Sequence, residues 1–404
     1  MKRKFLSAGT GVVVVAAVMC ALLLNRKPQR FQTQFMDVFD TISMVISYTK
    51  TEHQFNTEYT KVHDELVTDH KLFDIYNDYT GQGNLKSANS PTDEASGADS
   101  TDQLLHNLKM VNDNAGVQPV KVDQRIVDLL KWGKTVYTLT DGKVNIAYGA
   151  VLSIWHDHRE IGMADPSKGT VPDVAELEAA AKHTNIDDVV IDEDAGTVFL
   201  RDPEMRLDVG GIAKGYSAED AAAMYISMKE KSTLLNLGGN IRSIGKRADG
   251  TAWVCPVESP TYRDSGTGEP YALTTGLHDM SLVTSGDYER YYTVDGVRYH
   301  HIIDPDTLFP STYHRSVTIL TENSALADAL STALFSMSEE DGRVLLDKIR
   351  SGEAQLELPF AEDEGSSTGT SADGDIGGIP VDAMWIDADG NMTMTDGFRA
   401  YVTG

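Results

Sequence analysis

The segment Leu207-Asp208-Val209-Gly210-Gly211-Ile212-Ala213-Lys214-Gly215-Tyr216 joins an apolar run to a helix expected over residues 215–229. Glycines let the backbone approach a ligand closely, and the first turn of a helix favours an anion. Lys214 adds a cation beside these glycines. The segment has neither the GxGxxG nor the P-loop spacing, so alone it fits either a phosphate-binding turn or a tight strand-to-helix turn capped by Asp208.

The sequence around this segment alternates between predicted strands and predicted helices. Apolar residues recur at helical spacing over 53–76, 123–139, 174–183 and 324–337. Strand-like runs lie at 39–48, 233–237, 252–257, 281–284 and 317–320, and hairpin turns are expected at 194–196, 295–296 and 389–390. The polar residues 25–35 are expected to form a linker. Helices mixed with antiparallel hairpins predict an α+β, or mixed α/β, fold.

Two further motifs follow predicted strands. Leu235-Asn236-Leu237-Gly238-Gly239-Asn240 places a second glycine pair after an apolar run, which fits a close approach to a ligand or a β-turn equally well. His300-His301-Ile302-Ile303-Asp304-Pro305 follows the second half of a hairpin. Adjacent side chains on a strand point to opposite faces, so we expect one histidine to be functional and the other structural or exposed.

A carboxylate and a hydroxyl share one face of the helix expected over 324–337. Asp328 and Thr332 are four residues apart, which places them on the same side of the helix. Oxygen ligands of this kind suit Mg2+. Viewed alone, the pair is better explained by an Asp in the first turn and a Thr bonded back to its own helix.

The charge balance narrows the range of partners. The 404 residues include 61 acidic and 35 basic side chains, a formal net charge of −26. Such a surface repels nucleic acid, anionic lipid and a dianionic dinucleotide, so a dinucleotide site would need a metal ion or local cations. The two cysteines, Cys20 and Cys255, lie in different contexts, and we expect no disulfide and a buried Cys255.

The N-terminus predicts attachment to a membrane. Basic residues 2–4 precede an apolar run over 5–24, which is long enough to span a bilayer as a helix with its basic end in the cytoplasm. A cleaved signal peptide, a lipoprotein signal ending at Cys20 and an uncleaved anchor all fit, with the anchor favoured and lipidation second. Each places the rest of the chain outside the cytoplasm. Residues 361–378 are acidic and of low complexity, which predicts a flexible insertion.

Taken in order, these motifs resemble the ApbE family of FAD:protein FMN transferases. The most specific stretches are LDVGGIAKGYSAE (207–219), LLNLGGNIRSIG (234–245), TSGDYERYY (284–292), HHIIDP (300–305) and ADALSTALF (327–335). The resemblance implies an ApbE-like, T-fold-related domain over residues 36–404, with antiparallel-rich sheets flanked by helices. An N-terminal anchor or signal segment and linker would precede it over residues 1–30. The implied reaction uses Mg2+ to move the FMN half of FAD onto a threonine of a partner flavoprotein, and AMP is released.

The resemblance also implies roles for individual residues. His301 corresponds to the histidine that activates the acceptor hydroxyl. The Gly211 carbonyl, Asp328 and Thr332 correspond to metal ligands, and Ser331 stands where some relatives have a further acidic ligand. Positions that contact FAD correspond to Phe39, Tyr76, Lys143, Val144, Asn145, Asp208, Lys214 and Ile303. Phe39 replaces a methionine common in the family, and Leu308 replaces a common glycine.

Two other functions are compatible with the same residues. One is a Mg2+-dependent FAD pyrophosphatase, in which water takes the place of the acceptor. The other is a non-catalytic FAD-binding surface protein, but the presence of Asp328, Thr332 and His301 together favours catalysis because storage needs no base. The expected location is the extracytoplasmic face of the cell membrane, with a single-span or lipid anchor. The expected partner is an extracytoplasmic or membrane-associated acceptor flavoprotein.

Overall fold

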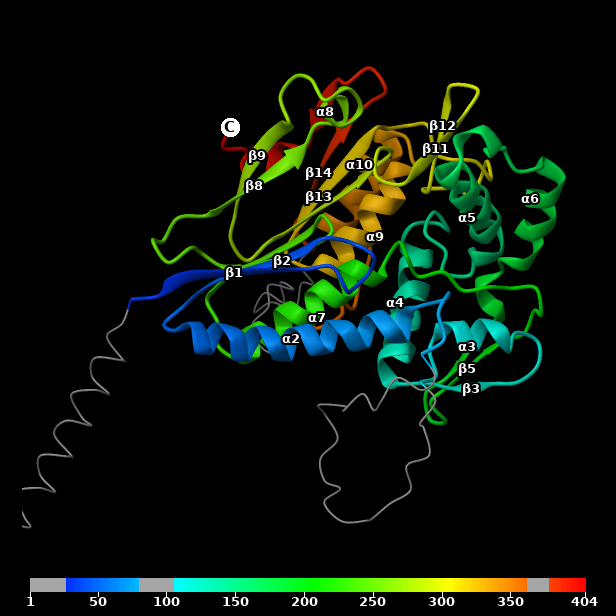
Figure 1. The fold of residues 1–404 in the computed structure, drawn as a ribbon, viewed down its shortest axis with the longest axis horizontal. Helices are drawn as coiled ribbons and strands as arrows, with labels where there is room; N and C mark the ends of the chain where they lie inside the picture. Colours follow the sequence, from blue (N-terminus) through cyan, green and yellow to red (C-terminus); the bar gives the residue numbers. More distant parts are fainter. Residues whose placement is uncertain (1–26, 80–104, 362–377) are drawn as a thin grey trace, which may run out of the picture.

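The computed structural model describes residues 27–79, 105–361 and 378–404 (Figure 1). The apolar N-terminal run and nearly all of the expected acidic insertion lie outside these residues. Among the described residues, no helix combines the length and the apolar character that crossing a bilayer requires.

An eight-stranded sheet forms the centre of the molecule, and each pair of neighbouring strands in it is antiparallel. In spatial order its strands are β1 (Gln29–Phe35), β2 (Ser43–Thr49), β6 (Ser232–Leu237), β7 (Asn240–Gly245), β10 (Ser281–Gly286), β13 (Ser316–Thr321), β14 (Val381–Ile386) and β15 (Met392–Met394). The register places Leu282 opposite both Ile241 and Leu320. Apolar side chains therefore share one face, and a shift by one residue would move them all to the other face.

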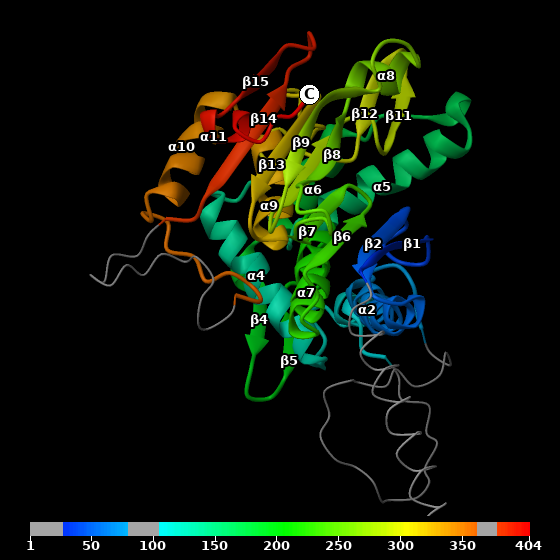
Figure 2. The same cartoon turned by 90° about the vertical axis from the view of Figure 1, so that its left-hand side faces the viewer.

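Helices cover one face of this sheet and a hairpin covers the other (Figures 1 and 2). The helices are α2 (Glu52–Phe73), α7 (Ala213–Ser227), α9 (Ser324–Phe335) and α10 (Glu339–Arg350), and the hairpin is β8 (Trp253–Glu258) with β9 (Tyr271–Leu277). Cys255 on β8 is a free, buried cysteine, and burial raises the pKa of its thiol to about 12. Alanine and leucine occupy most positions of α9, so nearly all of this helix is buried. Its burial places Asp328 inside the molecule.

Further helices and strands lie outside the central sheet and the helices named above. They are α3 (Leu108–Asp113), β3 (Val120–Lys121), α4 (Gln124–Leu139), α5 (Gly149–Ala164), α6 (Val174–Ala180), β4 (Val189–Asp192), β5 (Thr197–Leu200), α8 (Pro260–Ser265), β11 (Tyr291–Val294), β12 (Val297–His300) and α11 (Asp396–Arg399). Trp155 on α5 stacks on Tyr299 of β12, and its Nε1–H donates to the Leu308 carbonyl oxygen (2.8 Å). These contacts hold α5 against the hairpin that ends at the paired histidines.

Most of the predicted elements are present, but the structure also contains elements that the sequence pattern did not predict, among them β7, β9 and α10, and the strand predicted over 39–48 begins only at Ser43. The predicted linker over 25–35 is wrong for residues 29–35, which form β1. Phe31 and Phe35 alternate with polar residues there, and they pack on Phe55 and Tyr59 of α2. The sequence pattern also predicts no element over residues 149–164, where the structure has α5, because five consecutive polar residues (156–160) interrupt its apolar spacing.

Helices α7 and α9 approach each other closely at Gly215. A methyl group there would lie 2.3 Å from the Asp328 Cβ and 2.4 Å from the Ser324 carbonyl oxygen. The same helices are joined by Glu219, which accepts the Ser324 N–H (2.6 Å) and pairs with Arg242 of β7 (3.0 Å). The glycine therefore serves packing, and that packing places Asp328 beside the start of α7.

We expect Gly215→Ala to destabilise the protein by roughly 1–3 kcal/mol, the usual cost of forcing extra volume into a packed contact. Urea unfolding curves would measure the change. Gly169→Ala is a matched control, because a methyl group there would meet its nearest atoms at 3.5 Å, an ordinary contact. A Gly215→Ala protein as stable as the wild type would show that the two helices are not packed this closely.

Three carboxylates lie together between α2 and α7. Oxygen atoms of Glu65, Asp69 and Asp220 are all within 4.8 Å of one another, and Arg125 of α4 pairs with Glu65 (2.8 Å). Asp69 is 1% exposed, and burial together with the charge of Asp220 raises its pKa to about 8. The Arg125 guanidinium already supplies a cation here, so this arrangement favours a protonated Asp69 over a metal ion.

Asp69 should make the stability of the protein depend on pH. Its folded pKa of about 8 lies above the ordinary value of 3.8, so the stability it contributes is present at low pH and is lost as the pH rises through about 8. Between about pH 5 and pH 8.5, we expect the free energy of unfolding to fall less in Asp69→Asn than in the wild type. The difference should be ~1 kcal/mol or more, because one pKa unit corresponds to ~1.4 kcal/mol. Urea midpoints at the two pH values test this, with Asp64→Asn, an exposed carboxylate of the same helix, as the control. Identical pH dependence in Asp69→Asn and wild type would contradict it.

Candidate active site

The start of α7 and the middle of α9 bring three oxygen-bearing groups together. Thr332 Oγ1 lies 3.5 Å from the Gly211 carbonyl oxygen. Asp328 is 3% exposed, and its Oδ2 accepts the Gly215 N–H (2.7 Å) while its Oδ1 lies 3.7 Å from Lys214 Nζ. The three residues expected to bind a metal are therefore adjacent, with a lysine beside them.

Ser331, at the position of an extra acidic ligand in some relatives, is turned away from this group. Its hydroxyl donates to the Asp328 carbonyl oxygen (2.9 Å) and contacts the Ser285 hydroxyl of β10 (2.8 Å). It joins α9 to the sheet.

The two adjacent histidines have different environments, as the geometry of a strand predicts. His300 is 6% exposed, with Nε2 donating to the Ser311 carbonyl oxygen (2.8 Å) and Nδ1 accepting the Ile302 N–H (3.2 Å). His301 Nδ1 lies 3.3 Å from the Arg290 carbonyl oxygen, and this partner assigns the proton to Nδ1. Nε2 of His301 then has a free lone pair, so His301 is the histidine that can accept a proton.

Three cations surround His301. Burial and, in decreasing order, the positive charges of Arg290, His300, Arg159 and Lys214 hold the pKa of His301 well below its usual range. The imidazole is therefore neutral at neutral pH. Because Lys214 also lies beside Asp328, the histidine and the oxygen-bearing group belong to one site.

Tyr76 and Asp208 are two further expected FAD contacts, and the charge of Asp208 acts on the Tyr76 side chain. The Tyr76 ring, 53% exposed, stacks on His156 of α5 with ring centroids 4.7 Å apart. Partial burial and the charge of Asp208 raise the pKa of Tyr76. Asp208 Oδ1 accepts the Gly210 N–H (2.8 Å), which shapes the glycine turn. The free face of Tyr76 is suited to stacking on a planar ring.

The turn at residues 143–145 is tied to the turn that follows His301. Lys143 Nζ pairs with Asp304 Oδ1 and Asp306 Oδ2, each at 2.8 Å. Lys143 therefore joins the two turns, in addition to any contact with a ligand.

The other three expected contacts of this region are held in place by the surrounding protein. Val144 and Ile303 are 7% and 6% exposed. Asn145 Nδ2 donates to the Thr184 carbonyl oxygen (2.9 Å), and its Oδ1 accepts the Ala147 N–H (2.8 Å). These side chains hold the backbone of both turns in place.

Phe39 lies in a strained loop beside the second glycine pair. Phe39 and Asp40 have φ of +53° and +50°, values that side chains disfavour. The Phe39 N–H donates to His70 Nδ1 (3.1 Å), and the two rings pack edge to face. A Cβ at Gly238 would lie 2.2 Å from Thr41 Oγ1. Of the two interpretations of this glycine pair, the β-turn is the one that the structure supports, because Gly238 and Gly239 connect β6 to β7 with φ of +55° and +94°.

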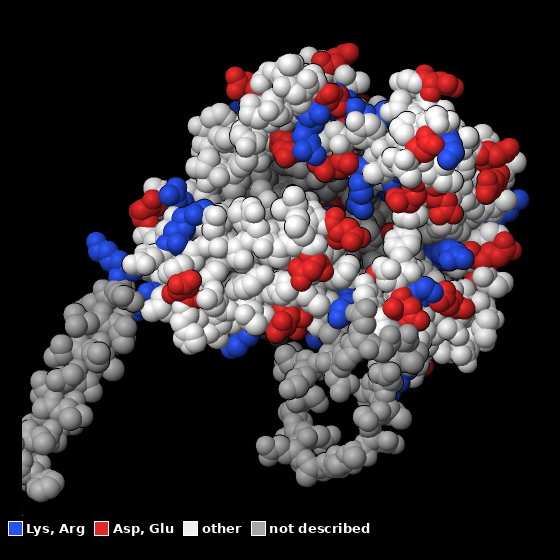
Figure 3. Space-filling model, viewed as in Figure 1, with Lys and Arg blue, Asp and Glu red and all other residues white. Residues whose placement is uncertain are grey.

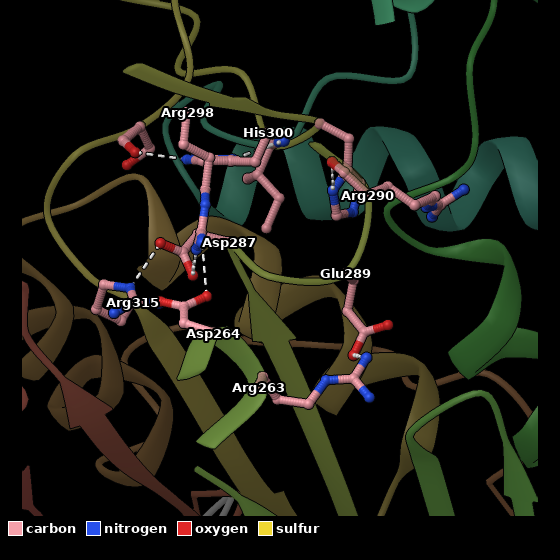
Figure 4. A network of polar contacts seen from close by, with 11 residues as sticks. Arg263, Asp264, Asp287, Glu289, Arg290, Arg298, His300 and Arg315 are labelled. Atoms are coloured by element: carbon pink, nitrogen blue, oxygen red, sulfur yellow. Dashed lines mark hydrogen bonds and ion pairs between the residues drawn. The ribbon is translucent and has the colours of Figure 1, made fainter. Parts of the chain in front are cut away.

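Ion pairs fix the segment that leads to His301 (Figure 4). Arg315, which directly precedes β13, pairs with Asp264 of α8 (2.6 Å) and with Asp287 (2.7 Å), which directly follows β10. Arg298 of β12 contacts the same two carboxylates. Arg290 takes no part in this network, and its side chain extends away from it.

Comparisons with known proteins agree with this geometry. A model described as the ApbE family matches residues 87–356, which is more than half of the chain. This protein belongs to the ApbE family. The FAD:protein FMN transferase of Treponema pallidum (strain Nichols) is 36% identical over 253 residues, 59% of this chain and 67% of that protein. The FAD:protein FMN transferase of Klebsiella pneumoniae (strain 342) is 33% identical over 233 residues, 57% of this chain and 68% of that protein.

Solved structures of ApbE proteins share the fold. The crystal structure of the ApbE protein from Thermotoga maritima superimposes with a TM-score of 0.68 at 26% identity, covering 93% of this chain and 100% of that one. The flavin transferase ApbE from Vibrio cholerae gives 0.65 at 22% identity, covering 92% and 100%, and at that identity shows the fold alone. The expected ApbE-like α+β fold is therefore confirmed.

Sequence reasoning did not identify three basic residues of this ApbE site. His156 and Arg159 lie on α5, which the sequence pattern did not predict, and Arg290 lies within the stretch TSGDYERYY (284–292) but was assigned no role. The signal that could have found them is the spacing of Trp155 and Arg159, four residues apart on a helix. The site is distinct from a cavity of about 620 Å3 at the start of α2, whose walls include Gln54 and Arg247.

Proposed function

We propose that this protein transfers the FMN moiety of FAD to a threonine hydroxyl of an acceptor flavoprotein, with Mg2+ as cofactor, and releases AMP. Membership of the ApbE family and the names of its relatives support the flavin transfer. The observation that carries the proposal is a neutral His301 close to Lys214, which itself lies beside Asp328. The site thus combines a base, a set of oxygen ligands and a helix start that favours phosphate.

The residues present fit a hard divalent cation. The Gly211 carbonyl, the Asp328 carboxylate and the Thr332 hydroxyl supply oxygen atoms, the ligand type that Mg2+ prefers. A Cβ at Gly211 would lie 3.3 Å from Thr332 Cγ2, so glycine keeps this carbonyl close to the hydroxyl. Bound there, Mg2+ would neutralise phosphate oxygens of FAD and orient the departing AMP.

His301 has the tautomer that a general base needs. Its Nδ1–H is held by the Arg290 carbonyl oxygen, so Nε2 would take the proton of the acceptor hydroxyl. The hydroxyl oxygen forms a bond to the phosphorus of the FMN half. The bond from that phosphorus to the bridging oxygen breaks, and AMP leaves with the electron pair. A base in this position is worth roughly 10²–10⁴-fold in rate.

The other expected FAD contacts form the walls of the proposed substrate site. Tyr76 would stack on a ring of FAD through its exposed face. Lys214 would pair with a phosphate. Phe39, Asp208 and Ile303 would line the site, together with the turn at residues 143–145.

We place this reaction at the extracytoplasmic face of the cell membrane. The basic residues 2–4 and the apolar run over 5–24 support an N-terminal membrane anchor, by a single span or by lipid. The acceptor would then be an extracytoplasmic or membrane-associated flavoprotein.

The test is incubation of the protein with FAD, Mg2+ and an acceptor domain, followed by mass spectrometry of the acceptor. The proposal expects the mass of FMN added to one threonine, together with one AMP for each FMN transferred. Release of free FMN and AMP with an unmodified acceptor would instead support a pyrophosphatase. FAD binding without release of AMP would support a storage protein.

A further inference from the structure

Two arginines border the site without a carboxylate partner. Arg159 lies on α5 beside His156, whose ring stacks on Tyr76, and Arg290 lies between β10 and β11 with its carbonyl oxygen 3.3 Å from His301 Nδ1. Burial and the charge of Arg290 both lower the pKa of Arg159. Within the described residues neither side chain forms an ion pair with a carboxylate; Arg159 Nη2 contacts His156 Nδ1 (3.0 Å). Two like charges in a partly buried site destabilise the protein unless an anion joins them.

The nearby acidic groups offset this charge only in part. The charges of Glu160 and Asp208 raise the pKa of Arg159, whereas the charge of Arg290 lowers it. Neither carboxylate forms an ion pair with Arg159. Asp208 instead uses Oδ1 to accept the Gly210 N–H (2.8 Å). The whole chain has a net charge of −26, so unpaired cations are not a general property of its surface. On the face shown in Figure 3, the surface is hollowed near its centre, and both basic and acidic side chains lie around the hollow.

We propose that Arg159 and Arg290 form an anion subsite that binds the diphosphate of FAD, an inference that rests on the proposed function. A guanidinium group presents several N–H donors in a planar fork that matches phosphate oxygens. In the part of the chain that the structure describes, one contact of Arg159, the one to His156, involves these donors, so the others are available. Each dinucleotide bound would bring two phosphate charges to two guanidinium charges.

The position beside His301 selects the diphosphate over other anions. Both arginines and Lys214 act on the His301 imidazole, which takes the acceptor proton in the proposed reaction. The attacked phosphorus must lie next to that hydroxyl, and the second phosphate is one bridging oxygen away. The subsite would therefore separate FAD from riboflavin, which has the same ring system and no phosphate.

The test compares Arg159→Met, Arg290→Met and the double variant for the binding of FAD and riboflavin, each with Mg2+ present. We expect each single variant to weaken FAD binding by roughly tenfold or more, since a hydrogen bond to a charged group is among the strong ones. Riboflavin binding should change by less than about twofold. Arg290→Lys should restore part of the FAD affinity, because it restores the charge without the fork.

The matched control is Arg263→Met. Arg263 is exposed near Arg290 and pairs with Glu258 (3.4 Å) and Glu289 (3.2 Å), so its charge is already neutralised. FAD affinity unchanged in the double variant, or FAD and riboflavin weakened equally, would overturn the subsite. These binding measurements need no acceptor and no turnover. A wild type that binds FAD through the two arginines but modifies no acceptor would refute the transfer reaction and leave the subsite standing.

Discussion

Replacing His301 with alanine should lower the rate of FMN transfer by roughly 10²–10⁴-fold, the usual contribution of a positioned general base. FAD binding should change little, because the imidazole acts on the acceptor hydroxyl and not on the dinucleotide. Single-turnover transfer to an acceptor domain measures the rate, and flavin fluorescence measures the binding. The combination of lost rate and retained affinity separates a base from a residue that binds substrate.

The pH dependence gives a second readout of the same group. Burial and the charges of Arg290, Arg159 and Lys214 hold the pKa of His301 well below 6.5, so the base stays unprotonated into mildly acidic solution. We therefore expect transfer by the wild type to fall only well below pH 6.5, and we expect His301→Ala to lack this acid limb. His158→Ala is the control, because His158 lies on α5 and contacts the Thr170 carbonyl oxygen instead. Unchanged transfer by His301→Ala would remove the proposed base from the mechanism.

The sequence predicts those parts of the site that depend on local spacing. Asp328 and Thr332 share a helical face because four residues make about one turn, and the structure places Thr332 next to Gly211 and Asp328 next to Gly215. The alternation of side chains along a strand likewise predicts different roles for the two histidines, and His300 is indeed buried with both ring nitrogens engaged. The hairpins β4–β5, β11–β12 and β14–β15 follow from their turn residues.

The parts that the sequence did not reveal depend on contacts between distant segments. Arg159 and Arg290 are more than a hundred residues apart, and the packing of α5 on the β11–β12 hairpin, in part through Trp155, brings them to one site. The glycine pair at 238–239 could not be assigned from sequence, because Thr41 fills the space beside Gly238 from another strand connection. Leu308 takes φ of +63°, the left-handed conformation that explains a glycine there in relatives, and its carbonyl is held by Trp155.

The second large effect is expected at the proposed metal site. Asp328→Asn should lower transfer by about 100-fold or more at fixed Mg2+, because even partners in the outer shell of metal sites contribute about 10–100-fold and Asp328 would be a direct ligand. The substitution keeps an oxygen that can accept the Gly215 N–H, so the contact between α7 and α9 is retained. It removes the negative charge that Mg2+ and Lys214 share.

Titration with Mg2+ distinguishes loss of the metal from loss of the fold. For Asp328→Asn we expect a higher Mg2+ concentration at half-maximal transfer and a weaker heat of Mg2+ binding in calorimetry, with a Tm close to that of the wild type. Asp347→Asn, an exposed carboxylate on α10, should leave both unchanged. Thr332→Val should also weaken Mg2+ binding, because it removes the hydroxyl that lies 3.5 Å from the Gly211 carbonyl oxygen. Thr332→Ser should not, because serine retains a hydroxyl. If Mg2+ bound equally to all of these proteins, the cation would have to be held elsewhere, and the two helices would meet at Gly215 for packing alone.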